Sequence, residues 1–253
     1  MADREPGVPN EAAAWSDFDT DAYWHNNYAS VLPEDAEIIR CASKFLTEAC
    51  GPPSPYKRAV DVGAGANLYP GLLMLPWAKN IVFTEYASPN INWLSENLAD
   101  TPGEWHWQPF WDLVASLPGY RAVEHPRHEL AAVHEVRTVS IFDLPPSAWD
   151  LGSMFFVADG MTTEEAEFKR AVRSFLGALV PGSPFMMAFM ESSAGYDVGG
   201  IRFPAVKVTP TSLDVVLADL PVTGTSVLRT DNSVRRLRTG YDAMLFVTGF
   251  VTK

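Results

Sequence analysis

The sequence predicts an α/β fold in which a mostly parallel sheet carries helices on both faces. Short apolar runs alternate with longer segments whose apolar residues recur at helical spacing. The first short run, residues 58–62, leads into a turn with two glycines. Strands and helices that alternate in this way form parallel sheets covered by helices. Because 47% of the 253 residues are hydrophobic, we expect one domain over residues 1–253, with one sizeable core.

The first half of the chain contains two strand–helix repeats. Residues 34–49 form an amphipathic helix that ends at Gly51 and the prolines that follow it. The buried strand over residues 58–62 and its glycine turn continue into a short helix over residues 69–75. A second strand, residues 80–86, precedes a helix over residues 89–98. The aromatic residues that follow are expected in the core; they are Trp105, Trp107, Phe110 and Trp111.

The second half continues the pattern and ends in a hairpin. The expected strands cover residues 135–142, 152–157 and 183–190, and the expected helices cover residues 164–179 and 211–220. The last apolar strand, residues 243–252, pairs with residues 225–229 as an antiparallel hairpin. At the other end, residues 1–10 are polar and contain proline and glycine, so we expect a frayed terminus.

The charge balance argues against nucleic acid as a substrate. The formal net charge is −12, with 31 acidic and 19 basic residues, and such a surface repels phosphate backbones. The one basic cluster, Arg235, Arg236 and Arg238, could contact an anionic substrate group or could be a solvated loop. We expect a monomer that acts on a small molecule.

The sequence also favours a cytoplasmic protein without a metal. No apolar run approaches the roughly 18 to 20 residues that span a bilayer, and the first 14 residues lack the features of a secretory signal. Cys41 and Cys50 match no zinc or redox spacing, so we expect reduced thiols. The five histidines show no metal-ligand spacing.

The glycine turn and the end of the next strand together indicate a nucleoside site. Asp61 leads into Gly63 and Gly65, and glycines allow a tight turn and a close approach of a ligand to the backbone. Glu85 ends the next strand 20 residues after Gly65, where a carboxylate can accept both ribose hydroxyls of an adenosine group. Asp143 could accept a bond from the adenine amino group, with Leu144 over the ring edge. Ordinary surface acids are the alternative reading for Glu85 and Asp143.

These residues resemble the small-molecule methyltransferase family of nicotinamide, phenylethanolamine and thioether/indolethylamine N-methyltransferases. The resemblance covers roughly residues 18–251. It includes a tyrosine pair before the first strand, a glycine turn that runs into a tyrosine, and an acidic, an aromatic and an amide residue after the second strand. The matching residues here are Tyr23, Tyr28, Gly63, Gly65, Tyr69, Glu85, Tyr86 and Asn90.

The resemblance implies a Rossmann-like seven-stranded sheet that binds S-adenosylmethionine and releases S-adenosylhomocysteine. Residues 58–253 would form the core and residues 1–57 a helical lid. Tyr23, Tyr28 and Tyr69 would hold the methionine part of the cofactor. Glu85 and Asn90 would hold the ribose, and Tyr86 would lie against adenine.

The family usually has aspartate at the position of Glu85, and serine and proline at Ala64 and Ala66. Residues 116–133 match the family poorly. A glutamate reaches further than an aspartate and still accepts two bonds, so we expect cofactor binding to survive the change. Because residues 116–133 match poorly, we expect this region to differ in shape from the family.

Three acids after the late strands are the candidate catalytic and acceptor-binding residues. Asp159 and Glu191 follow apolar strands, and Asp242 precedes the last strand, so all three should reach the edge where open α/β sheets bind ligands. Carboxylates there can hold an amine and pass its proton to water. Tyr196 would line the acceptor pocket. The alternative readings are plain loop acids and a half-buried loop tyrosine.

The sequence therefore predicts methyl transfer to a small acceptor, with an amine or aromatic nitrogen as the leading choice. Transfer to oxygen or an activated carbon on the same fold is one alternative. A protein that binds S-adenosylmethionine without turnover is the other.

Overall fold

The computed structural model describes residues 7–230 and 240–252. Its main sheet has seven strands in the order β3-β2-β1-β4-β5-β9-β8. They are β1 (Lys57–Val62), β2 (Ala78–Glu85), β3 (His134–Thr138), β4 (Leu151–Phe155), β5 (Pro184–Met190), β8 (Val222–Arg229) and β9 (Met244–Val251). Strands β1 to β5 pair in parallel, whereas β9 is antiparallel to both β5 and β8. This confirms the mostly parallel sheet that ends in an antiparallel hairpin.

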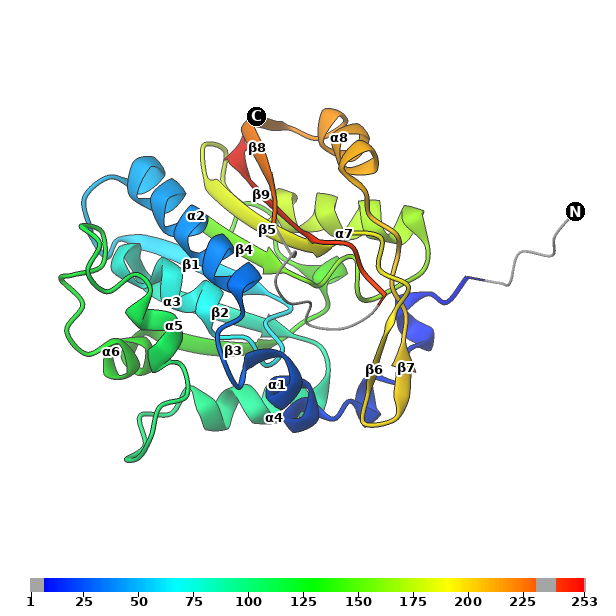
Figure 1. Cartoon of the computed structure of the whole chain (residues 1–253). Coiled ribbons are helices and arrows are strands. Elements are labelled where there is room, and N and C mark those ends of the chain that lie inside the picture. The colour runs from blue at the N-terminus through cyan, green and yellow to red at the C-terminus, as the bar shows by residue number, and fades with distance from the viewer. Residues whose placement is uncertain (1–6, 231–239, 253) are drawn as a thin grey trace, which may run out of the picture.

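Helices cover both faces of this sheet (Figure 1). The α-helices are α1 (Thr20–Tyr28), α2 (Pro33–Cys50), α3 (Tyr69–Met74), α4 (Ser88–Asn97), α5 (Gln108–Asp112), α6 (Pro126–Val133), α7 (Glu165–Gly177) and α8 (Pro210–Ala218). Ala59 and Met186 belong to the apolar cluster under α2 and α3, while Val60 and Met187 belong to the cluster under α7 and α8. Neighbouring strand residues enter opposite cores because side chains alternate along a strand.

The expected strand over residues 135–142 is too long. β3 ends at Thr138, and a short 3-10 helix, η4 (Ile141–Asp143), follows it. The Ser140 side chain caps this helix by accepting from the Phe142 N–H. Serine favours such local bonds over a strand ladder, and so the strand ends before it.

A second, two-stranded sheet was not expected from the sequence. Its strands are β6 (Tyr196–Val198) and β7 (Ile201–Phe203), which pair as an antiparallel hairpin. Gly199 and Gly200 connect them with φ values of 57° and 82°. Positive φ at both central residues is the requirement of the two-residue hairpin turn, which glycine meets without strain. We refer to this element as the 196–203 hairpin.

The N-terminal segment is tied down rather than frayed, as far as it is described. The Val8 N–H donates to Thr163 Oγ1 at 2.6 Å, and the Thr163 N–H donates back to the Val8 carbonyl at 3.0 Å. Trp15 and Phe18 pack on Phe203 of the 196–203 hairpin, with ring centroids 5.2 and 5.0 Å apart. Residues 1–6 and the cluster Arg235, Arg236 and Arg238 lie outside the described residues.

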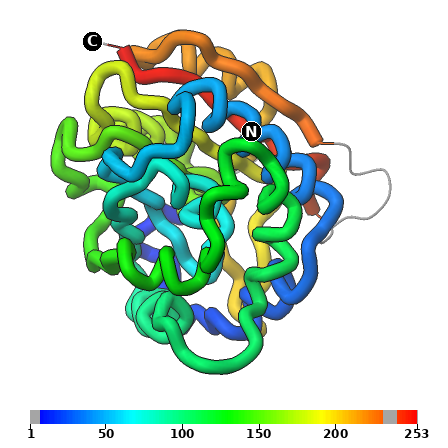
Figure 2. Tube along the Cα trace, turned by 90° about the vertical axis from the view of Figure 1, so that its left-hand side faces the viewer, coloured from blue at the N-terminus to red at the C-terminus, as the bar shows by residue number. Residues whose placement is uncertain are grey.

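The aromatic cluster that was expected in the core is there. Trp107, Phe110 and Trp111 are buried, and Trp105 packs against them. The segment that carries α5 and α6, green in both views, lies on the side of the molecule that faces the viewer in Figure 2. It includes residues 116–133, where the family resemblance is weak.

The strand order creates a switch point beside β1. β2 and β3 lie on one side of β1, and β4, β5, β9 and β8 lie on the other. Crossovers that leave in opposite directions open a crevice at the carboxyl ends of the strands, where open α/β sheets bind ligands. The predicted site residues follow these strand ends.

Candidate active site

The turn after β1 requires its two glycines. Gly63 and Gly65 have φ values of 65° and 55°, a region that side chains other than glycine avoid. A Cβ atom on Gly63 would lie 2.6 Å from Val157 Cγ1. One on Gly65 would lie between Glu85 and Asn90, 3.9 Å from Glu85 Oε2 and 3.7 Å from Asn90 Nδ2. The turn is therefore a backbone cradle that opens towards these two side chains.

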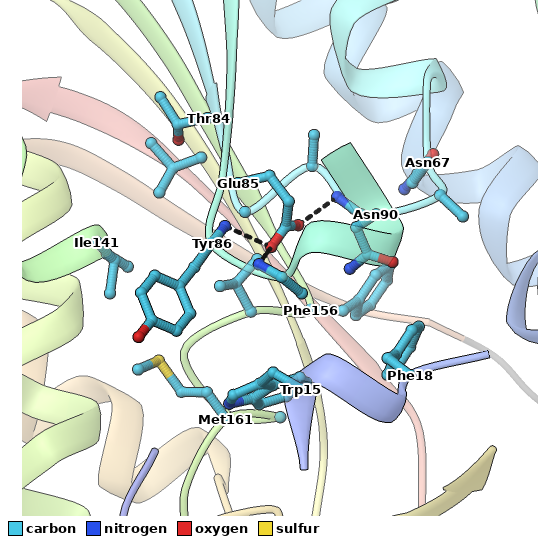
Figure 3. Close-up of a pocket in the computed structure, with 18 of the residues that line it drawn as sticks. Trp15, Phe18, Asn67, Thr84, Glu85, Tyr86, Asn90, Ile141, Phe156 and Met161 are labelled. Atoms are coloured by element: carbon cyan, nitrogen blue, oxygen red, sulfur yellow. Dashed lines mark hydrogen bonds between the residues drawn. The ribbon is translucent and has the colours of Figure 1, made fainter. Parts of the chain in front are cut away.

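Glu85 is held in place at the end of β2 by three backbone N–H groups. Its Oε1 accepts from Tyr86 at 2.7 Å and Ala87 at 2.9 Å, and its Oε2 accepts from Gly65 at 2.9 Å (Figure 3). Burial raises the pKa of Glu85, while these N–H groups and the Asn90 side chain act in the opposite direction. The backbone N–H groups therefore fix the Glu85 carboxylate at the edge of the turn.

Asn90 connects this site to α1, the first helix of the segment that the sequence predicts as a lid. The Thr20 hydroxyl, at the start of α1, donates to Asn90 Oδ1 at 2.7 Å. Both side chains are buried. The residue expected to hold a ribose thus also bonds to the segment expected to close over it.

Seven of the eleven predicted cofactor residues line one cleft. It is lined by Tyr23, Tyr28, Gly63, Gly65, Glu85, Tyr86 and Asn90. Residues that the sequence analysis missed also line it: Asn10, Trp15, Phe18, Asn67, Thr84, Ile141 and Met161. In Figure 3, Trp15 and Phe18 lie across the cleft from Glu85. Trp15 and Phe18 are two large aromatic residues in a mainly polar or small-residue segment. Their presence there was the signal in the sequence that could have identified this side of the cleft.

These surroundings fit an adenosyl group. The glycine cradle lets a ligand approach the backbone, the Glu85 and Asn90 pair suits hydroxyl groups, and Ile141 and Met161 offer an apolar surface to a flat ring. Tyr86, 60% exposed beside the cleft, offers a ring face for stacking.

A second cavity of about 230 Å³ adjoins the first. Tyr23, Tyr28, Phe156, Gly160 and Tyr196 line both. A cavity of about 150 Å³ can hold a benzene ring, so this one suits a ring with a short side chain. It lies against the carboxyl ends of β4 and β5, through residues near Phe155 and Met190.

Asp159 and Tyr196 line this second cavity, as expected of acceptor-binding residues. Asp159 is 1% exposed, and its Oδ2 accepts from the Met190 N–H at 2.7 Å. Nearby Phe156 has a φ of 60°, an uncommon conformation for an aromatic residue and one that clusters at functional sites. Asp35 and Asp197 also line the cavity, and the sequence analysis selected neither.

Glu191 and Asp242 line neither cavity. The Glu191 carboxylate accepts from Arg229 Nε at 2.7 Å. The Glu191 side chain therefore forms an ion pair with the end of β8. Asp242 is exposed, and its backbone N–H donates to the Glu191 carbonyl at 2.9 Å. Of the three expected acids, Asp159 alone is in the lining of the second cavity.

Four expected cofactor residues also lie outside the cleft lining. Asp61 is buried beneath the turn, where the Ser153 hydroxyl donates to it at 2.7 Å. Tyr69 stacks on Phe110 and donates to Asp35. Asp143 is exposed and Leu144 packs against the α7 side of the core. Because β3 ends early, Val139, Ser140 and Ile141 line the cleft in place of Asp143 and Leu144.

Among residues 7–230 and 240–252, no three His, Cys, Asp or Glu side chains gather as metal ligands. Within that same described part of the chain, no helix combines the length and apolarity needed to cross a membrane.

Comparison with solved structures supports the fold. The chain matches the Burkholderia thailandensis 1,6-didemethyltoxoflavin-N1-methyltransferase, bound to 1,6-didemethyltoxoflavin and S-adenosylhomocysteine, with a TM-score of 0.51 and 16% identity over 87% of this chain and 80% of that one. It matches the N-methyltransferase NodS of Bradyrhizobium japonicum WM9, solved with S-adenosylhomocysteine, with a TM-score of 0.53 and 10% identity over 92% and 93% of the two chains.

Comparison of sequences leads to the family. Phenylethanolamine N-methyltransferase of Sus scrofa is 25% identical over 95% of this chain and 89% of its own. Nicotinamide N-methyltransferase of Homo sapiens is 24% identical over 63% of this chain and 64% of its own. The model of the NNMT/PNMT/TEMT family matches residues 8–248. The chain therefore belongs to the NNMT/PNMT/TEMT family.

Proposed function

We propose that this chain is a methyltransferase that uses S-adenosylmethionine to methylate a nitrogen atom of a small molecule. The observation that carries the proposal is the pair of adjoining cavities, one built to fit an adenosyl group and one lined by carboxylates. Membership of the family supports both the cofactor and the class of reaction. The size of the second cavity suits a small acceptor.

Bound S-adenosylmethionine would supply an electrophilic methyl group on a sulfonium. The residues of the chain supply position and exclusion of water. Glu85 and Asn90 bind the ribose hydroxyls, and Tyr86 stacks on the adenine. Tyr23 and Tyr28, which line both cavities, enclose the reacting groups. Holding two reactants in line can lower a barrier by roughly 7 to 11 kcal/mol.

Asp159 is the acceptor-binding carboxylate in this proposal. Its buried position in the second cavity lets it accept an N–H bond from the acceptor and hold the proton that the nitrogen must lose. Glu191, bound to Arg229, instead fixes the end of β5 against β8. Tyr196 contributes a wall shared by the two cavities. Ser140 and Ile141 take the position beside adenine that the sequence assigned to Asp143 and Leu144.

We further propose that the protein is a cytoplasmic monomer with a single domain. Residues 58–253 form its catalytic core, and residues 1–57 form a cap over that core. Its net charge of −12 supports a small-molecule acceptor over a nucleic acid.

The test is a screen of primary amines, aromatic nitrogen heterocycles, phenols and keto acids, with release of S-adenosylhomocysteine as the measurement. We expect turnover with at least one nitrogen acceptor. Gly63→Val, whose side chain would collide with Val157, should abolish it. Turnover with oxygen or carbon acceptors alone would replace the nitrogen assignment. Cofactor binding without any turnover would point to a binding protein.

A further inference from the structure

The acceptor cavity contains a buried carboxylate from an unexpected element. Asp35 lies in the first turn of α2, is 2% exposed, and lines the second cavity. Asp159 reaches the same cavity from the segment after β4. Two carboxylates that enter one cavity from two elements suggest that both face the acceptor.

Two protein groups donate to the Asp35 carboxylate, the Tyr69 hydroxyl and the Leu32 backbone N–H. The Tyr69 hydroxyl donates to Asp35 Oδ1 at 3.3 Å. This distance is longer than the roughly 2.5 to 3.0 Å that is usual for O–H···O bonds. Burial raises the pKa of Asp35 to about 7. The bonds from Tyr69 and from the Leu32 backbone counteract this rise, and the neighbouring Glu34 adds to it. A carboxylate has roughly four acceptor positions, so these two donors leave positions on Asp35 that a ligand in the cavity can fill by donating hydrogen bonds.

The composition of the cavity indicates what such a ligand would be. Its described lining includes three acids, Asp35, Asp159 and Asp197, and no lysine or arginine. Apart from Ser193, the remaining lining is aromatic, apolar or amide-bearing, from residues such as Phe156, Met190 and Asn27. Carboxylates with low exposure favour cations over neutral or anionic ligands. The cavity therefore suits an apolar ring that carries an amine.

We propose that Asp35 is a specificity-determining residue that binds the amino group of the acceptor directly, together with Asp159. This inference rests on the proposed function and adds the residue that selects amines from neutral compounds of the same shape. Charged hydrogen bonds of this kind change affinity by about tenfold to a hundredfold.

A purely structural role makes a different prediction. If Asp35 served only to tie α2 to Tyr69 of α3, removal of the Tyr69 hydroxyl would have the same effect as removal of the Asp35 charge. If Asp35 binds the acceptor, Tyr69→Phe keeps the charge in the cavity and the selectivity for amines should persist.

The test compares two probes of the same shape, 2-phenylethylamine and 2-phenylethanol, by calorimetry on protein saturated with S-adenosylhomocysteine. The wild type should bind the amine at least tenfold more tightly than the alcohol. Asp35→Asn and Asp35→Ser should each reduce this ratio about tenfold while affinity for S-adenosylhomocysteine changes less than about threefold. The use of two neutral variants allows for one that does not fold.

Two controls separate the explanations. Glu48→Gln removes an exposed acid of the same helix, α2, that is paired with Lys44 and lies outside the cavity lining, and it should change the ratio less than about twofold. Tyr69→Phe should keep the wild-type ratio. A wild type without a preference for the amine, folded Asp35 variants that retain it, or a Tyr69→Phe variant that loses it would each overturn the inference. If turnover occurs with amines and the Asp35 variants retain selectivity, only the role of Asp35 fails; if turnover occurs with oxygen acceptors alone, the proposed function fails.

Discussion

Single carboxylates in this molecule have different roles because they meet different partners. Glu85 meets three backbone N–H groups, Glu191 meets Arg229, and Asp35 meets the Tyr69 hydroxyl and one backbone N–H beside a cavity. All three side chains carry a carboxylate. The donors around each carboxylate decide whether it stabilises a turn, forms an ion pair or faces a ligand. Predictions about single residues follow from these differences.

Glu85→Ala should weaken binding of S-adenosylhomocysteine about tenfold to a hundredfold. The substitution removes a charged acceptor, worth about 1.5 to 3 kcal/mol per hydrogen bond, and releases the Gly65 N–H that shapes the cradle. Titration calorimetry gives the affinity. Glu96→Ala, an exposed change on α4, is the control and should have no effect. An unchanged affinity in folded Glu85→Ala protein would remove Glu85 from the site.

Asp61→Asn should make the protein less sensitive to rising pH. Burial raises the pKa of Asp61 to about 8, opposed by the Ser153 bond and increased by Glu85. Because the folded state holds this proton more tightly than the unfolded chain does, Asp61 contributes stability that is complete below pH about 4 and is lost as the pH rises through about 8. The Tm of the variant should therefore gain on that of the wild type between pH 5 and pH 9.

Thermal unfolding at several pH values measures this gain. Asp150→Asn is the contrasting control, because its pKa is lowered by the Arg58 bond. The stability from Asp150 is present above the unfolded pKa and is lost as the pH falls, so its variant should differ from wild type least in acid. Parallel Tm profiles for wild type and Asp61→Asn would refute the assignment of a raised pKa.

At the scale of elements, the proposed lid packs on a segment far away in the chain. Trp15 and Phe18 of the N-terminal segment pack on Phe203 of the 196–203 hairpin. Val198 belongs to the same small cluster. The first segment has no apolar core of its own, so its order should depend on this cluster.

Phe203→Ala should loosen residues 10–28 and weaken cofactor affinity. Removal of a buried phenylalanine costs about 3 to 5 kcal/mol in a core, and here the loss falls on the lid because Phe203 packs mainly in its cluster. Hydrogen exchange should become faster in residues 10–28 and stay unchanged in β1 and β4. Val227→Ala, at an exposed position of β8, is the control. Equal exchange in all three proteins would argue against the coupling of hairpin and lid.

At the scale of the whole molecule, the sequence predicts what depends on local pattern. The strand–helix order, the glycine turn and the acid after the second strand are close in sequence, and the expected sheet and the positions of Gly63, Gly65 and Glu85 agree with the structure. Glu191 could not be placed correctly, because its partner Arg229 is 38 residues away. Asp35 could not be found, because nothing in the pattern of an amphipathic helix shows that its first turn meets a cavity formed by other elements.

The two cavities share five lining residues, Tyr23, Tyr28, Phe156, Gly160 and Tyr196. A ligand that orders these residues in one cavity lowers the cost of ordering them for the other. We therefore expect S-adenosylhomocysteine to raise the affinity for 2-phenylethylamine about fivefold or more, the lower end of common coupling factors. Reciprocity requires the amine to raise the affinity for S-adenosylhomocysteine by the same factor, and calorimetry in both orders measures both. Phe203→Ala, which loosens the lid, should reduce the factor towards one. Independent binding in the wild type would mean that the shared residues are rigid before either ligand arrives, and that the lid has no part in bringing the two ligands together.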